Sequence, residues 1–159
     1  MALREIRMYK DEILRKKSRE VKDVNERIKT LAGDMAETMY KADGVGIAAP
    51  QVGVLRRIIV VDAGSGLITL INPEVVKSEG EQVGVEGCLS IPNVAGEVSR
   101  PQIVTVKGLN ANGESIEITA EDLLARVLCH EIDHLDGVLF TDKVIRYVDP
   151  KEEDDDNKE

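Results

Sequence analysis

Both histidines of this chain fall within one short stretch, CHEIDHLDG, at residues 129–137. His130 and His134 are four residues apart, so on a helix their imidazoles lie on one face, separated by roughly 40° of rotation. Two imidazoles in that arrangement bind a single metal ion, and Glu131, on the flank of the face, is placed to act as a general base toward water. The pattern therefore predicts a hydrolytic metal site on a helix.

The same residues also fit a structural interpretation, in which both histidines are satisfied polar groups on a buried helix. HExxH is a short motif and chance matches to it are common. Two observations favour the metal site: both histidines of the chain lie in this motif, and the surrounding helix is apolar. Burying two unliganded imidazoles among apolar residues would be costly.

A catalytic metal site needs a third protein ligand and a fourth position left for water. Cys129 adjoins His130 but points about 100° away around the helix, and we interpret it as a buried core thiol. Cys88 lies in the bend EGCLS beside Gly87, where a side chain can be presented to a site. By itself Cys88 also fits a small hydrophobic residue in a turn, but beside the histidine motif a ligand is the better interpretation.

Composition limits the classes of function. A chain of 159 residues is expected to form one domain. Its formal charge of −9 argues against autonomous binding to DNA or RNA, because phosphate contacts need Lys and Arg. No apolar run approaches the ~20 residues of a membrane span, and MALREIRMYK lacks the apolar core of a signal peptide. We therefore expect a cytoplasmic protein with no membrane or DNA partner, and its two cysteines as free thiols.

The first part of the chain is expected to form a basic, irregular arm followed by a helix. A capping box formed by Asp23 and Glu26 predicts the start of that helix, a stripe of apolar residues continues it, and Asp43-Gly44 ends it. The glycine-rich stretch 44–53 is predicted to be irregular.

Short strands are predicted between this helix and the motif helix. The expected hairpins join 57–61 with 67–72, and 103–109 with 114–118. Residues 75–85 are weaker strand material broken by glycines, and 86–92 are predicted to be tight and non-repetitive. Thr119 is expected to cap the motif helix, and Gly137 to end it.

These elements predict an α+β fold, with antiparallel strands packed around a central metal-binding HExxH helix in a single domain. The domain is expected to span residues 1–148. Residues 149–159 are expected to form an acidic, disordered tail, since this charge run has no apolar partner.

Three motifs together carry a resemblance to a known family. GVGIAAPQ (44–51), EGCLS (86–90) and HEIDH (130–134) resemble the signature motifs of peptide deformylase, in the family's order. The resemblance covers nearly the whole chain. The uninterrupted stretch between the first two motifs resembles the compact bacterial form, which lacks insertions there.

This resemblance implies an activity and a set of site residues. The activity is hydrolysis of the N-formyl group from the formylmethionine that begins nascent polypeptides, with release of formate. By this resemblance, Cys88, His130 and His134 are the metal ligands, and Glu131 is the general base and later the general acid. The Gln51 amide and the Leu89 N–H donate hydrogen bonds to the oxyanion. Gly46 contacts the main chain of the substrate. The family's metal is divalent iron, and zinc, nickel or cobalt are alternative occupants, since the ligand types suit several of these ions.

Residues around the ligands are expected to support the site. Val45, Leu123 and Val127 are predicted to line a pocket for methionine, with the aliphatic stem of Arg126 at its rim. Glu86, Asp133 and Arg100 are candidates to brace the ligand helix, and the alternative for Arg100 is a surface residue.

The resemblance implies formylated nascent peptides as the partner, and hence proximity to the ribosome. Some family members carry a basic terminal helix thought to dock there. This chain ends instead in KEEDDDNKE, which ribosomal RNA would repel, so we expect no docking through the tail. Two other functions stay open on the sequence: a small HExxH endopeptidase, and a catalytically inactive relative that binds metal or nascent chains.

Overall fold

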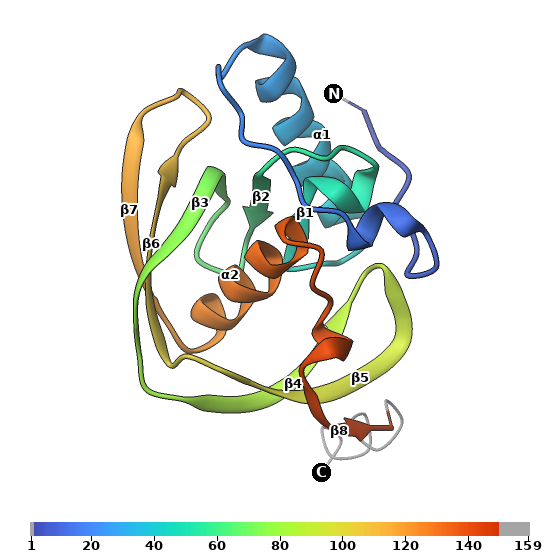
Figure 1. Ribbon diagram of the computed structural model, residues 1–159. Helices are drawn as coiled ribbons and strands as arrows, with labels where there is room; N and C mark the ends of the chain where they lie inside the picture. The colour runs from blue at the N-terminus through green and yellow to red at the C-terminus, as the bar shows by residue number, and fades with distance from the viewer. Residues whose placement is uncertain (1, 150–159) are drawn as a thin grey trace.

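The computed structural model describes residues 2–149 and places two α-helices against two antiparallel sheets (Figure 1). This arrangement confirms the predicted α+β class with antiparallel pairing. Apart from Asp149, the predicted acidic tail lies outside the described residues.

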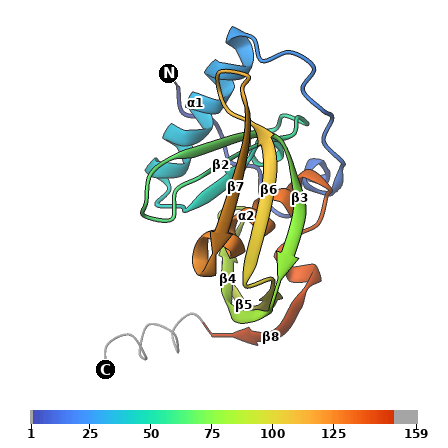
Figure 2. The same cartoon turned by 90° about the vertical axis from the view of Figure 1, so that its left-hand side faces the viewer.

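The larger sheet has the strand order β1-β2-β3-β6-β7, formed by Gly46–Ala48, Ile58–Val61, Ile68–Glu79, Ile103–Leu109 and Ser115–Glu121. The smaller sheet has the order β4-β5-β8, formed by Gln82–Cys88, Ile91–Arg100 and Val144–Val148. The helices are α1 (Glu26–Lys41) and α2 (Asp122–Leu135), with 3₁₀ turns η1 (Glu12–Arg15), η2 (Ala49–Val52) and η3 (Phe140–Asp142). Figure 2 shows the long strands β3, β6 and β7 side by side, with α2 behind them.

Strand β2 is buried on both faces, which explains its unbroken apolar sequence. Ile59 and Val61 belong to the core that α2 shares with the larger sheet. Ile58 and Val60 belong to a second core, shared with Met35 and other residues of α1. Because successive side chains of a strand point to opposite faces, the two helices cover the two sides of β2. The larger sheet thus fixes α2 on one face and α1 on the other.

Both predicted hairpins are present. β2 pairs with β3, and β6 pairs with β7 without a register shift from Ile103↔Glu121 to Leu109↔Ser115. β3 runs further than predicted, to Glu79, and crosses two irregularities in its pairing with β6. Gly80 then turns the chain at φ +69, so the first of the two glycines expected to break residues 75–85 separates β3 from β4.

Several predicted local structures were wrong. Stretch 44–53 is not irregular throughout, because β1 pairs with β2 there and η2 follows it. Residues 86–92 mostly continue β4 and begin β5, with a turn between them. A short strand needs only a partner edge, and a single sequence does not reveal which edge is available.

The predicted helix starts also need correction. Asn25, not Asp23, caps α1, and its side chain accepts a hydrogen bond from the Ile28 N–H at 3.1 Å. Thr119 lies in β7, where its hydroxyl is 3.0 Å from that of Thr105, and α2 begins only at Asp122. Short polar residues are favoured in turns and strands as well as at helix starts, so residue type alone did not locate either helix start.

Candidate metal centre

Helix α2 carries the HEIDH motif in its last two turns, and the fold fixes the C-terminal end of this helix firmly. The Leu135 carbonyl accepts hydrogen bonds from the Ser18 N–H at 2.8 Å and from the Arg57 guanidinium at 3.1 Å. A cation at this end is favourable, because the last carbonyls of a helix carry partial negative charge. Gly137 then leaves the helix at φ +76, and an added Cβ would lie 2.5 Å from the Arg15 carbonyl oxygen.

Three potential ligands converge from two elements. Cys88 ends β4, while His130 and His134 come from α2, and one donor atom from each lies within 4.8 Å of the other two. The Cys88 sulfur is 3.4 Å from Nε2 of His134. Donors that share one tetrahedral ion at bond lengths of 2.0–2.3 Å lie roughly 3.3–3.6 Å apart. The Cys88–His134 separation falls within this range, and a thiolate with two imidazoles is a donor set that suits a divalent transition metal.

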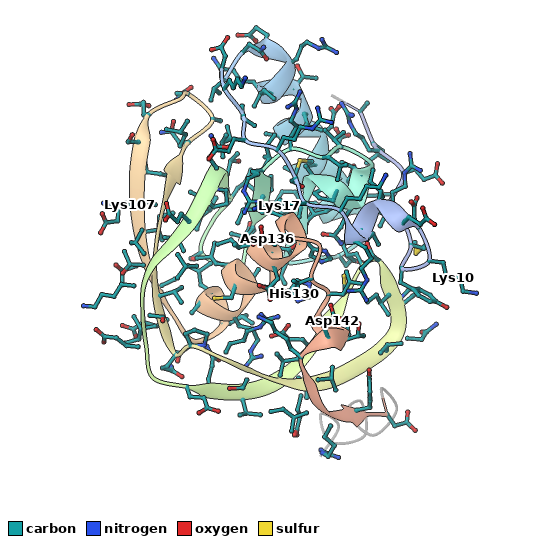
Figure 3. The ribbon with its side chains drawn as sticks, in the orientation of Figure 1. Lys10, Lys17, Lys107, His130, Asp136 and Asp142 are labelled. Carbon is teal, nitrogen blue, oxygen red and sulfur yellow. The ribbon has the colours of Figure 1, made fainter. Side chains whose placement is uncertain are left out.

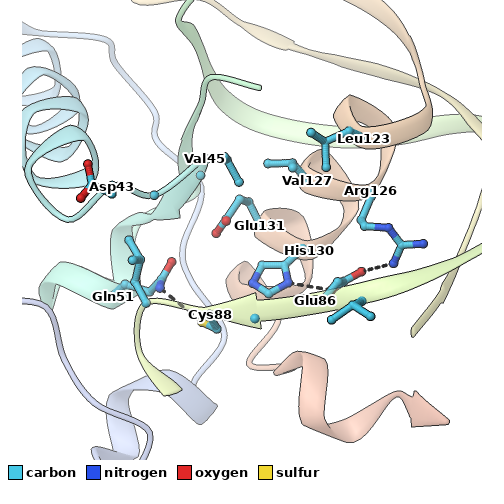
Figure 4. A pocket seen from close by; sticks show the side chains of 15 residues that line it. Asp43, Val45, Gln51, Glu86, Cys88, Leu123, Arg126, Val127, His130 and Glu131 are labelled. Carbon is cyan, nitrogen blue, oxygen red and sulfur yellow. Dashed lines mark hydrogen bonds and ion pairs between the residues drawn. The ribbon is translucent and has the colours of Figure 1, made fainter. Parts of the chain in front are cut away.

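The orientation of His130 supports the same use. Its Nδ1 is 2.9 Å from Glu86 Oε1 (Figure 4), which leaves Nε2 as the nitrogen available to the group of converging donors. A carboxylate on the far nitrogen of a histidine ligand fixes the ring and its tautomer. Figure 3 shows His130 pointing into the interior between α2 and the smaller sheet, whereas Lys10 projects outward from the arm.

Glu86 joins this histidine to two buried arginines. Arg100 donates to both carboxylate oxygens at 2.9 Å, and Arg126 donates to Oε2 at 2.6 Å. Burial of Glu86 favours the neutral acid, but hydrogen bonds from His130 and Arg100 outweigh it and lower the pKa of Glu86 to about 2. The carboxylate therefore stays ionised and holds the His130 imidazole in place.

Arg100 also reaches across to α2. Its Nη1 donates to Asp133 at 2.6 Å, and Lys143 approaches the same Asp133 oxygen at 3.0 Å. Arg100 is only 3% exposed, so it is not the surface residue that the sequence left as an alternative. The ion pairs of Arg100 connect β4, β5 and α2, and so brace the helix that carries both histidines.

The carboxylate of Glu131 is buried and incompletely hydrogen-bonded. It is 3% exposed, and its Oε1 has no hydrogen-bond partner within residues 2–149. Burial raises the pKa of Glu131 to about 7. A carboxyl group with a pKa near the working pH both accepts and returns a proton efficiently, which is the requirement for a general acid–base group.

Gln51 lines the same cavity as Glu131, and both ends of its side-chain amide are hydrogen-bonded. Oε1 accepts from the Ala48 N–H at 2.9 Å, and Nε2 donates to the Ser90 hydroxyl at 3.1 Å. The same Nε2 lies 3.6 Å from the Cys88 sulfur, so one of its hydrogens faces the ligands. Gln51 is 1% exposed, and Leu89 lines the same cavity. The amide is thus prepared to donate a hydrogen bond next to the three donor atoms.

Two glycines of the 44–51 motif make room for these side chains. A Cβ added at Gly46 would lie 2.6 Å from Glu131 Oε2 and 2.9 Å from Val127 Cγ1. A Cβ at Gly44 would lie 2.7 Å from Leu89 Cδ1. Glycine therefore leaves room for Glu131 and Val127 at position 46 and for the end of the Leu89 side chain at position 44, and φ is not positive at either glycine.

A cavity of about 340 Å³ opens beside the donor atoms. Val127 is buried in its floor, while Val45 and Leu123 are about half exposed at its rim (Figure 4). Arg126 lines the cavity as well, while its guanidinium is buried against Glu86 and the carbonyl of Val98. A volume of this size accommodates a single side chain with the group to be hydrolysed.

The structure also separates the two cysteines. Cys129 packs against the core beneath the larger sheet and is not in the group of converging donors, and burial raises the pKa of its thiol. Sequence reasoning missed Ser90, which is fully buried and directly follows the predicted donor Leu89. It also missed the ion pairs of Arg126, although an arginine on the apolar face of a helix signals a carboxylate partner.

Comparison with known proteins gives consistent matches. The family model described as polypeptide deformylase matches residues 3–149. A peptide deformylase of Acetivibrio thermocellus is 64% identical over 152 residues, which cover 96% of this chain and 89% of that protein. No helix within residues 2–149 has the length and apolar character needed to span a membrane.

Solved structures agree with these matches. The crystal structure of peptide deformylase from Thermotoga maritima superposes with a TM-score of 0.88 at 43% identity, covering 89% of this chain and 97% of that one. A peptide deformylase from Synechococcus elongatus in complex with actinonin gives a TM-score of 0.86 at 40% identity, covering 88% of this chain and 78% of that one.

Proposed function

The chain belongs to the polypeptide deformylase family, and we propose that its cavity binds a formylated peptide N-terminus beside a metal ion held by Cys88, His130 and His134. Like other members of the family, it is a hydrolase that removes the N-formyl group from the N-terminal formylmethionine of nascent polypeptides and releases formate. The family is metal-dependent. For this chain we propose Fe²⁺ as the native ion, with Zn²⁺, Ni²⁺ or Co²⁺ as ions that the same ligands accept.

One observation supports this assignment of roles. Three potential metal donors lie close to the buried carboxylate of Glu131, whose Oε1 has no hydrogen-bond partner within residues 2–149. Cys88, His130 and His134 offer one sulfur and two nitrogens, and Glu131 lies against Gly46 on the adjoining wall of the cavity. A purely structural metal site needs no general base and is closed by four protein ligands. Bound there, a divalent cation would polarise the formyl carbonyl and make a nearby water more acidic.

The proton steps are assigned to Glu131. The carboxylate accepts a proton from the water whose oxygen attacks the formyl carbon. After the tetrahedral species forms, the C–N bond breaks and Glu131 returns that proton to the amine nitrogen of methionine. The products are formate and a free N-terminus. Glu131 lines the same cavity as Cys88 and His130, which suits it to both transfers.

The negative charge that develops on the formyl oxygen requires donors that are already in place. We assign this task to the Gln51 amide and the Leu89 N–H. The support for Gln51 is its fixed orientation, with Nε2 3.6 Å from the Cys88 sulfur. One such donor contributes about 3–4 kcal/mol to stabilising a transition state of this kind.

The methionine side chain is assigned to the apolar part of the cavity. Val127 forms its floor, and Val45 and Leu123 are exposed at the rim, where a bound methionine side chain would cover them. Glycine at position 46 allows a peptide backbone to approach β1 without a side chain in the way. We assign residues 1–148 to the deformylase domain, with the central α2 helix as its metal-binding element.

Two assays test this assignment. Formate release from a formyl-Met peptide should be rapid, and an unformylated peptide of the same sequence should not be cleaved. Cleavage of the unformylated peptide would instead support an endopeptidase. Glu131→Ala should abolish formate release while the protein still binds one metal ion per chain, and unchanged turnover would refute the assigned role of Glu131.

The cellular setting follows from the substrate. Nascent chains begin on ribosomes, so we propose a cytoplasmic enzyme that acts close to the ribosome. Residues 149–159 are assigned no role in rRNA docking, because their charge is negative. Deleting 151–159 should leave ribosome co-sedimentation unchanged, and a salt-sensitive interaction lost on deletion would contradict this.

A further inference from the structure

The N-terminal arm, residues 2–11, connects two segments of the site that belong to different sheets. The Arg7 N–H donates to the carbonyl of Gln51 at 2.7 Å, and the Tyr9 N–H donates to the carbonyl of Ser90 at 2.8 Å. Gln51 lies in η2, which follows β1 of the larger sheet, whereas Ser90 lies in the turn between β4 and β5 of the smaller sheet. Figure 1 shows the arm passing alongside η2 on its way to η1. The arm therefore holds the two segments together through its backbone.

These two carbonyls belong to residues whose side chains also meet. The Gln51 amide donates one hydrogen to the Ser90 hydroxyl at 3.1 Å, which leaves its other hydrogen on the side of Cys88. Both side chains are buried, with Gln51 1% exposed and Ser90 fully buried. A small movement of either backbone segment would change the direction in which the amide points.

The arm is anchored on both sides of these contacts. Before them, Arg4 pairs with Asp34 of α1 at 2.9 Å, and the Arg4 N–H donates to Thr38. After them, η1 places Leu14 in a core shared with Phe140 and with residues of β5. An extended segment fixed at both ends transmits its position to whatever its middle contacts.

We propose that residues 7–9 of the arm form a strap that positions the catalytic amide of Gln51, with Ser90 as its intermediary. Neither the strap nor Ser90 touches the reacting atoms; both act through the direction of the Gln51 Nε2–H bond. The inference rests on the proposed role of Gln51 as oxyanion donor.

Tyr9→Pro removes the strap's hydrogen bond to Ser90, together with the half-exposed Tyr9 ring that Lys10 approaches at 5.8 Å. Tyr9 is the second residue of a turn closed by the Asp11 N–H donating to the Met8 carbonyl at 2.8 Å, a position that favours proline. Glu12→Pro is the matched control: it adds a proline to the same arm at the first position of η1, and its N–H makes no hydrogen bond within residues 2–149.

The strap predicts a specific kinetic result for the metal-loaded enzyme. Tyr9→Pro should lower kcat between about tenfold and 100-fold, with KM changed less than about threefold, because misplacing a catalytic group by ~1 Å costs about that much. Glu12→Pro should match the wild type. Ser90→Ala, which is nearly isosteric and keeps the fold, should lower kcat in the same range. Wild-type kcat in Tyr9→Pro would overturn the strap, and wild-type kcat in Ser90→Ala would overturn Ser90 as its intermediary.

A double-mutant cycle separates the strap from a general loss of structure. In a Gln51→Ala background, adding Tyr9→Pro or Ser90→Ala should lower kcat less than about twofold, since their effects pass through an amide that is no longer present. An equal loss in both backgrounds would refute the strap but leave the role of Gln51 intact. Wild-type turnover by Gln51→Ala itself would refute its proposed role as oxyanion donor.

A readout that does not depend on activity completes the test. In zinc-loaded, ¹⁵N-labelled protein, the side-chain amide resonances of Gln51 should shift in Tyr9→Pro and remain in place in Glu12→Pro. Unshifted resonances in Tyr9→Pro would show that the arm does not orient this amide.

Discussion

Replacing Gly46 by alanine places a methyl group against the proposed general base. The new Cβ would lie 2.6 Å from Oε2 of Glu131, and 2.9 Å from both Cγ of Glu131 and Cγ1 of Val127. Ordinary contact begins at 3.4 Å, so the carboxylate must move roughly 0.8 Å away from the new methyl group. Glu131 is 3% exposed and Val127 is 5% exposed, so the added methyl displaces two buried side chains of the cavity lining.

The expected cost follows from this displacement. Misplacing a catalytic group by ~1 Å costs about 10²-fold in rate, and a general base contributes about 10²–10⁴-fold in total. We therefore expect Gly46→Ala to lower kcat about 10²-fold. Overpacking should also reduce the free energy of unfolding by about 1–3 kcal/mol. The metal content should stay at one ion per chain, because the three atoms nearest to the added methyl belong to Glu131 and Val127.

Gly46→Ala is compared with a control glycine variant and with the same substitution in a Glu131→Ala background. Gly87→Ala is the control, since its added Cβ would meet only the Val94 carbonyl at an ordinary 3.6 Å. Formate release should be near wild type for Gly87→Ala and strongly reduced for Gly46→Ala. In a Glu131→Ala background, Gly46→Ala should cause no further loss and a smaller change in stability. A Gly46→Ala enzyme with wild-type kcat would refute the argument that glycine is needed there to leave Glu131 in place.

The remaining predictions concern the ligands, the buried ion pairs and pH. Cys88→Ala should abolish stoichiometric metal binding, measured by elemental analysis after dialysis, whereas Cys129→Ala should retain it; loss of metal in both would contradict the assignment of Cys88 alone. Arg100→Leu should lower the free energy of unfolding by about 3–5 kcal/mol in urea titrations. The reason is that the buried Glu86 loses its bidentate ion pair and Asp133 loses its hydrogen bond from Arg100. A change below about 1 kcal/mol would argue against the bracing role. The Ala2 N–H and the Arg4 guanidinium lower the pKa of Asp34 below its ordinary 3.8, so its ionised form stabilises the folded state. Asp34→Asn should therefore be less stable than wild type at pH 7, and this difference should disappear as the pH falls through the lowered pKa; a constant difference from pH 7 to pH 2 would contradict it.

Parts of this architecture were legible in the sequence because they depend on local patterns. The alternation of residues 103–109 and 114–118 around a turn predicts a hairpin, and β6 and β7 pair accordingly. The unbroken apolar run of β2 indicates burial on both faces, which the two helices provide. Histidine spacing on a helix is likewise local, and the structure brings both imidazoles together with Cys88.

Other features depend on contacts between distant segments, which a single sequence does not encode locally. β1 exists because the edge of β2 is available to it, although its residues read as an irregular glycine-rich stretch. The buried ion pair of Arg126 with Glu86 joins residues 40 positions apart, so the helix position of Arg126 alone did not reveal it. The link from the arm to Ser90 joins residues about 80 positions apart through backbone groups, for which side-chain types give no signal.

The central claim is that Cys88, His130 and His134 hold one divalent metal ion and leave a coordination position open to solvent. X-ray absorption spectroscopy of anaerobically purified protein tests it most directly, with Cys88→Ala measured in parallel. We predict one sulfur at about 2.3 Å and two imidazole nitrogens at about 2.0–2.1 Å, with the remaining scattering from light atoms of solvent and the sulfur absent in Cys88→Ala. A spectrum without sulfur in the wild-type protein, or with a fourth protein ligand, would contradict the account.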